Sequence, residues 1–265
     1  MSGLLGPESE LDDIRREMDA IDDGLMILLE RRFAASEHVR TIKARNGSLA
    51  ASPFRPAREA AILRRLLNRP ESLVPRDLLV RLWRVILTGS ALSQAPVTIH
   101  ISRRLNSSMG LRLRIRDYFG TTPVEEYKDE AQALMQVNAS PGDISIVETE
   151  SPWADAFAEG KSGAARVVAC LPFLRDDAIP KLLVFGHSTP EPTGEDETLI
   201  VSDGKLPRDF LPAPLWQAKL GSRRVSCLHG FLTDREIPLV SLIRTNPQLG
   251  LKIAGHYASP FEVKK

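Results

Sequence analysis

A long segment without proline is the feature that most limits how this chain can fold. From Glu8 to about Arg45 the sequence holds no proline and a single glycine. Apolar and small residues recur there every three or four positions, as in a coiled-coil seam. They are Leu11, Ile14, Met18, Ile21, Leu25, Leu28, Ala35, Val39 and Ile42. Such a helix would run about 55 Å, longer than a small domain is wide. Because the seam needs a second long helix along it, the pattern predicts a dimer.

Two shorter helices are expected to follow. Asn46-Gly47-Ser48 is a stop signal, Pro53 and Pro56 precede a helix over 57–68, and Pro75 opens a third helix over 75–94. Beyond residue 96, short apolar runs alternate with polar helical stretches, which is typical of α/β architecture. The predicted fold class is α + α/β, with an all-helical domain over 1–95 and an α/β domain over 96–265.

The sequence beyond residue 96 predicts a series of short strands and helices. Strands are expected at VTIHIS, PVEEY, DISIVE, ARVVACL, KLLVFG, TLIVS and LKIAGHY, and helices near 108–119, at DEAQALMQV and around 214–220. A basic stretch fits the polar side of a helix, although its alternating positions would equally suit a strand. It comprises Arg103, Arg104, Arg112, Arg114 and Arg116.

Composition removes several classes of function. Lys and Arg total 35 and Asp and Glu total 34, so a net charge of +1 provides no electrostatic case for nucleic acid. No run approaches the ~20 apolar residues of a membrane helix, and the first residues do not resemble a signal peptide. These features predict a cytoplasmic protein without a membrane partner. Cys170, Cys227, His187 and His229 lack the paired spacing of a metal site, so neither metal nor cofactor is expected.

Arg32 interrupts the apolar seam where a residue like Leu28 is expected. A cation in that position is unfavourable unless an anion pairs with it. Lys43, eleven residues on, lies only about 20° around the helix and about 16 Å along it, so the two could bracket a small dianion. Arg15 lies about 100° around from Arg32 and would face something else, such as the pocket of a partner protomer. Alternatively, Arg32 forms a buried salt bridge with an acid such as Glu59.

Two polar pairs occur in the later helices. Ser90 and Gln94 share one side of the third helix at i, i+4 spacing; they either face a pocket or mark an exposed helix end. Arg58 and Glu59 open the second helix, where an acid suits the helix dipole in any case.

These residues form an ordered set within IRREMDAIDDGLMILLERRFAASEHVRTIK, PFRPAREAAILRRL and LWRVILTGSALSQ. The set comprises an Arg in the first turns, an R-R pair, a Lys eleven residues on, an R-E pair and S-x-x-x-Q. At these spacings, roughly residues 8–95 resemble the all-helical AroQ-type chorismate mutase domain. Members of that family are intertwined homodimers that convert chorismate to prephenate, so the resemblance implies a homodimer through the long first helix.

The resemblance implies a pericyclic reaction that needs no nucleophile, metal or net proton transfer. Such a reaction needs a dianion held in a compact shape, with the developing charge on its ether oxygen stabilised. By resemblance, Arg32 binds one substrate carboxylate and the partner's Arg15 binds another. Lys43 and Gln94 would donate hydrogen bonds to the ether oxygen.

The remaining contacts are also implied by the resemblance. Glu59 would accept the ring hydroxyl, and Arg58 and Ser90 would complete the pocket. One departure stands out, because family members often carry an Asp shortly before the R-E pair. Here the segment 54–57 reads Phe-Arg-Pro-Ala and has no Asp, so the contact to the substrate hydroxyl is weakened or made in another way.

Residues 96–265 resemble part of prephenate dehydratase. The segments PVEEYKDEAQALMQV, GDISIVETES, KLLVFGHSTPEPTGEDETLIVS and LKIAGHYASPF carry this likeness, and bifunctional P-proteins fuse a mutase to such a domain. The Thr-Arg-Phe motif tied to dehydration is absent from the sequence. The segment therefore indicates a degenerate domain without dehydratase activity, with either a metabolite-sensing or a structural role.

The sequence thus predicts an isomerase, a chorismate mutase of aromatic amino-acid biosynthesis in the shikimate pathway. Two alternatives stay open: a non-catalytic metabolite-sensing protein on a mutase-like fold, and an isochorismate–pyruvate lyase, which shares the helical fold by resemblance.

Overall fold

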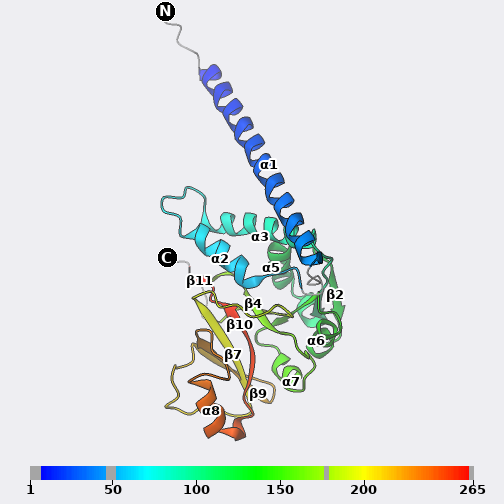
Figure 1. Cartoon of the computed structure of the whole chain (residues 1–265), viewed down its shortest axis with the longest axis vertical. Coiled ribbons are helices and arrows are strands. Elements are labelled where there is room, and N and C mark those ends of the chain that lie inside the picture. The colour runs from blue at the N-terminus through cyan, green and yellow to red at the C-terminus, as the bar shows by residue number, and fades with distance from the viewer. Residues whose placement is uncertain (1–6, 46–51, 176–178, 263–265) are drawn as a thin grey trace, which may run out of the picture. The chain divides into compact units, whose positions relative to one another are not determined.

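The described part of the first unit of the chain is one continuous helix. The computed structural model describes residues 7–45, 52–175 and 179–262, and the chain forms two compact units, residues 1–48 and 49–265. In the first unit α1 (Pro7–Arg45) covers 39 residues without interruption (Figure 1). Its predicted seam is open, since six apolar side chains are each 53–60% exposed. They are Leu11, Ile14, Met18, Ile21, Leu25 and Leu28.

The second unit begins with two further helices, α2 (Pro56–Leu67) and α3 (Arg76–Leu92), close to their predicted limits. Their apolar sides share a core with the segment that follows residue 171, through Leu63, Leu79 and Phe173. These helices therefore pack with the residues that follow them, and the unit boundary lies at 48/49. The domain limits 1–95 and 96–265 remain a prediction from sequence.

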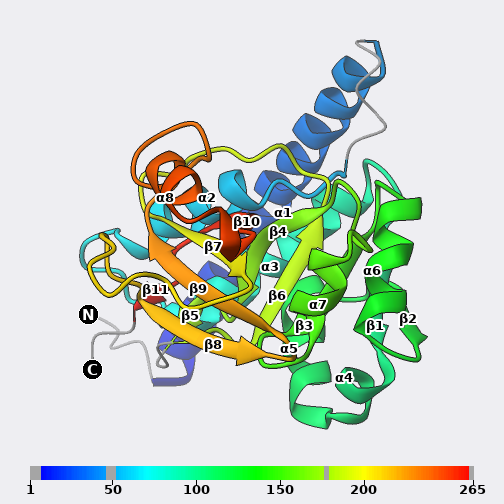
Figure 2. The same cartoon turned by 90° about the horizontal axis from the view of Figure 1, so that it is seen from below.

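Behind these helices lies a nine-stranded mixed sheet, in the part of the chain that the structure describes (Figures 1 and 2). Its order is β2-β1-β3-β6-β4-β10-β7-β9-β8. The pairs β1–β2, β1–β3 and β4–β10 are parallel and the others are antiparallel. The strands are β1 (Ile99–Ser102), β2 (Val124–Tyr127), β3 (Ile144–Glu148), β4 (Arg166–Leu171), β6 (Leu182–Gly186), β7 (Asp196–Ser202), β8 (Trp216–Leu220), β9 (Arg223–His229) and β10 (Lys252–Ala258). A separate parallel pair joins β5 (Leu174–Arg175) to β11 (Phe261–Glu262).

Helices cover both sides of the sheet, which is why strands such as β6 are apolar and buried throughout. Alternate residues of β6 belong to different hydrophobic cores. Leu183 lies in the core that includes α7, and Val184 lies in the core that includes α5. Figure 2 shows α6 and α7 at the same side of the molecule. The helices of this part are α4 (Arg103–Ser107), α5 (Met109–Phe119), α6 (Glu130–Ala139), α7 (Trp153–Ala158) and α8 (Leu239–Thr245), with a short 3₁₀ turn η1 (Pro247–Leu249).

The predicted fold class α + α/β is confirmed. One predicted element, the helix around 214–220, is wrong. The segment 214–220 is not a helix, because residues 216–220 form β8 and pair with β9 in antiparallel register. Its burial alternates, with Trp216 and Leu220 inward and Lys219 exposed. Gly221, at φ +63°, makes the tight turn into β9. Gly221-Ser222 between two apolar runs is a hairpin signal that would have identified this pair.

The basic stretch is helical, since Arg112, Arg114 and Arg116 are exposed positions of α5. Within the described ranges, no helix has the length and apolar composition needed to span a bilayer.

Candidate functional site

Two of the expected cations of α1 have different surroundings. Arg15 is exposed and pairs with Asp12 on the same helix, at 2.9 Å between Nη1 and Oδ1. Arg32 is half-buried, and burial lowers the pKa of its guanidinium. Lys43 belongs to α1, but its side chain lies outside the described part of the chain. Seventeen residues separate Arg15 from Arg32, about 25 Å along the axis. One small ligand therefore cannot touch both arginines of the same helix.

Glu59 is held at the start of α2. Its Oε2 accepts a hydrogen bond from Nη1 of Arg84 at 2.7 Å, and its Oε1 accepts one from the backbone N–H of Arg55 at 3.2 Å. The side chain of Glu59 is only 12% exposed, whereas Arg58 is exposed. The ion pair of Glu59 is thus formed within its own unit. Each carboxylate oxygen has two acceptor positions, so this carboxylate retains capacity for a further donor.

Arg84 is the charged residue that the sequence reasoning missed. It is 2% exposed, and its guanidinium lies 3.7 Å from the centre of the Tyr118 ring, a cation–π contact. It occurs at helical spacing with the buried Leu87, Thr88 and Ala91. Like Arg32, Arg84 is a cation within a regular apolar pattern. The signal was therefore present in the sequence.

Ser90 and Gln94 lie together at the end of α3. Ser90 is 5% exposed, and its hydroxyl donates to the carbonyl of Ile86 at 2.8 Å. Gln94 is half-buried and its amide donates to the carbonyl of Ser90 at 3.0 Å. The interpretation of this pair as an exposed helix end is therefore wrong. The expected site residues fall into both units, so their assembly into one pocket is a proposal.

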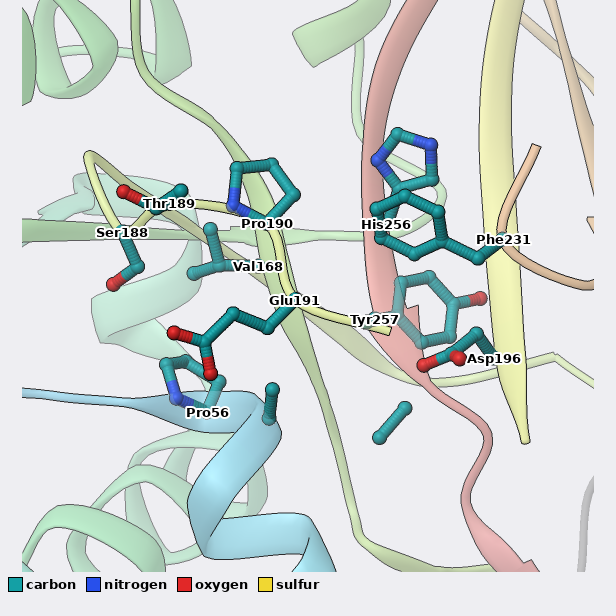
Figure 3. Close-up of a pocket in the computed structure, with 12 residues that line it drawn as sticks. Pro56, Val168, Ser188, Thr189, Pro190, Glu191, Asp196, Phe231, His256 and Tyr257 are labelled. Carbon is teal, nitrogen blue, oxygen red and sulfur yellow. The ribbon is translucent and has the colours of Figure 1, made fainter. Parts of the chain in front are cut away.

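A separate small cavity lies in the α/β part, between α2, β10 and the loop after β6 (Figure 3). Glu191 and Pro56 face each other there, and Glu191 forms an ion pair with Arg55. The ring of Phe231 stacks on that of His256, with centroids 4.2 Å apart. The cavity measures about 20 Å³, space for about one water molecule. In this state it cannot admit a metabolite.

His256 makes stability in this region sensitive to pH. Its Nε2 lies 2.7 Å from the carbonyl of Leu232 and so carries the proton, while the buried Nδ1 has no partner among the described residues. Burial lowers the pKa of His256 below its usual 6.5. The unfolded chain therefore binds this proton first, and the free energy of unfolding should fall as the pH drops below about 6.5. Urea unfolding at pH 7 and pH 5 would measure it. We expect a smaller loss in His256→Gln, and an equal loss in both proteins would contradict the assignment.

The two cysteines, Cys170 and Cys227, are buried and are not joined in a disulfide. Sγ of Cys227 lies 3.2 Å from Oε2 of Glu197, which also accepts a hydrogen bond from Tyr257 at 2.8 Å. Burial raises the pKa of Cys227 and of Tyr257. A protonated, enclosed thiol is a poor nucleophile, so this cluster supports packing of β7, β9 and β10 rather than covalent chemistry. His187 is hydrogen-bonded to the backbone of Val137, with 3.0 Å between its Nε2 and the carbonyl oxygen.

Comparison with known proteins confirms the resemblance of the helical part. Residues 14–95 match the family model of chorismate mutase type II, and this segment holds every expected site residue. No curated protein matches the chain.

Two solved structures match with low similarity. One is described as GqqA, a novel type of quorum quenching acylase, with 12% identity, a TM-score of 0.40 and coverage of 61% of this chain and 95% of the other. The second is prephenate dehydratase from Streptococcus mutans, with 14% identity, a TM-score of 0.37 and coverage of 64% and 100%. Both TM-scores are too low to carry a conclusion.

Proposed function

We propose that this protein is a homodimeric chorismate mutase. The observation that carries the proposal is the match of residues 14–95 to chorismate mutase type II, because that segment contains every cation and hydrogen-bond donor that the resemblance assigns to the substrate. The activity belongs to aromatic amino-acid biosynthesis, an expected cytoplasmic pathway. The substrate is a small dianion, and no cofactor is required.

In the proposed site, charge and neutral donors have separate roles. Arg32 and the partner's Arg15 hold the two carboxylates and so keep the reacting carbon atoms close. Lys43 and Gln94 donate to the ether oxygen as its bond lengthens, where fixed donors stabilise developing charge. Arg32, Lys43 and Gln94 are the proposed catalytic residues.

The substrate hydroxyl is assigned to Glu59, with Arg58 and Ser90 at the rim. The geometry of Glu59 supports this role, since its pairing with Arg84 fixes the carboxylate and leaves acceptor capacity. The fixed carboxylate also offers a substitute for the Asp that this chain lacks before Arg58.

The dimer is supported by two features of α1. Six of its nine seam residues are more than half exposed, and burying apolar surface contributes about 25 cal/mol per Å². Moreover, Arg15 and Arg32 of one helix are too far apart for one substrate, so the site needs Arg15 from a second chain.

The direct test is turnover of chorismate by the purified full chain. Loss of chorismate absorbance with prephenate as the product would support the proposal. Binding of chorismate without turnover would instead support the metabolite-sensing alternative. Release of pyruvate from isochorismate would support the lyase.

Charge placed in the seam should separate the protomers. We expect the double variant Ile21→Asp/Leu25→Asp to be monomeric in size-exclusion chromatography with light scattering. If its helices paired, each helix would bury two carboxylates without partners. Mutase activity should be lost with the dimer. Ala20→Asp, which lies outside the seam on the same helix, should remain dimeric. A double variant that stays dimeric and active would contradict the proposed interface.

A further inference from the structure

The helices α3 and α5 contact each other (Figure 1). A cavity of about 200 Å³ lies beside them. Its walls come from α3, from the last turns of α5 and from residues 171–174, which run from the end of β4 to the start of β5. Apolar side chains, among them Val80, Leu171 and Leu174, form one part of the lining. Three arginines, Arg81, Arg84 and Arg114, form another. This volume is below the 300–1,000 Å³ typical of drug-sized ligands and suits a small metabolite.

The arginines of this cavity have unused hydrogen-bond donors. Among the residues that the structure describes, neither Arg81 nor Arg114 has an ion-pair partner, and both are exposed at the opening. Arg84 is 2% exposed, and its Nε is buried without a hydrogen-bond partner. A buried donor without a hydrogen-bond partner is unfavourable. A ligand that accepts from Arg84 would remove that penalty.

The hydrogen-bond donors of the lining, rather than its net charge, favour an anion. Asp77 and Asp117 also line the cavity, and Glu59 balances Arg84 from outside it, so the charges of this region cancel. The donors of Arg81 and Arg114 are not engaged by an ion pair with either carboxylate of the lining. Guanidinium groups match the planar, two-oxygen geometry of a carboxylate. The aliphatic side chains opposite match a hydrocarbon group.

We propose that this cavity binds a small organic carboxylate with an apolar or ring-bearing group, and that its occupancy changes the affinity of the mutase site. The second part rests on the proposed function. Arg84 lines the cavity on one side and holds Glu59, the proposed acceptor of the substrate hydroxyl, on the other. A carboxylate that draws on Arg84 weakens its hold on Glu59. Ligand and substrate therefore influence each other's binding reciprocally.

The binding step can be tested by calorimetry on the full chain, without reference to catalysis. The probes are acetate, butyrate and phenylacetate, with phenylacetamide and phenethylamine as the neutral and cationic controls. We expect one site per chain, tightest for phenylacetate and absent for the two controls. No saturable binding of any carboxylate up to millimolar concentrations would overturn the proposal.

Two double variants of equal charge locate the site. Arg81→Gln/Arg114→Gln removes the two unpaired cations and should weaken phenylacetate binding at least tenfold. Arg65→Gln/Arg116→Gln removes two other exposed arginines, from α2 and α5, and should bind as the native chain does. Equal affinity in both variants would show that the carboxylate binds elsewhere.

The coupling is read from KM for chorismate with and without phenylacetate. We expect KM to rise at least twofold with bound phenylacetate in the native chain and to stay constant in Arg81→Gln/Arg114→Gln. Inhibition that persists in this variant would place phenylacetate in the mutase site itself and overturn the coupling. If the chain has no mutase activity, the proposed function fails while calorimetry still decides whether the cavity binds carboxylates.

Discussion

Arg32→Ala is expected to lower kcat/KM for chorismate about 10³-fold, because in the proposed site it would remove a charged contact to the substrate. The helix itself should persist, since alanine has the highest helix propensity. Initial rates, with light scattering to confirm an intact dimer, would measure this effect.

The matched control is Arg31→Ala, which removes the neighbouring exposed arginine of the same helix. Its rate should stay within a few fold of the native value. If Arg32→Ala turned over chorismate at the native rate, Arg32 would not bind the substrate, and the mutase assignment would lose its central cation.

Arg84→Ala is expected to lower the free energy of unfolding by about 3–5 kcal/mol, the usual cost of leaving the other member of a buried ion pair uncompensated. Here that member is Glu59, with Arg84 and Glu59 only 3% and 12% exposed. The variant also loses the contact of Arg84 with the Tyr118 ring. Urea unfolding monitored by circular dichroism measures the difference.

A control and a double variant separate the pair from general effects of losing an arginine. Arg81→Ala, one turn earlier on α3 and exposed, should change stability by less than about 0.5 kcal/mol. Glu59→Ala/Arg84→Ala should lose less than the sum of the two single variants, because the two side chains are coupled. Additive losses would show that the ion pair contributes little to stability.

Most of the regular elements could be predicted from short-range patterns. The three helices of the first 95 residues follow their apolar spacing, proline starts and glycine stop, all of which act within a few residues. The apolar runs of β1, β3, β6 and β10 likewise mark strands that are buried between other elements. The segment 214–220 was expected to be a helix, because the spacing of its apolar residues suits the helical period as well as the strand period. Its pairing with β9 decides between them.

The residues of the candidate site also differ in how far the sequence alone reveals them. Arg32 stands out in sequence because a charge breaks a regular apolar seam. The partner of Glu59 could not be read off, because Arg84 lies twenty-five residues further on and reaches Glu59 only when α2 packs against α3.

The sequence alone therefore determined the helical seam, the cation within it and the similarity of residues 14–95 to type II chorismate mutases, since periodicity and residue order are properties of the chain itself. Only the tertiary structure decided that Arg84 supports Glu59 and that three arginines line one cavity. The reason is that a buried charge must find its counter-charge or donor through packing, and packing joins residues that no local pattern connects.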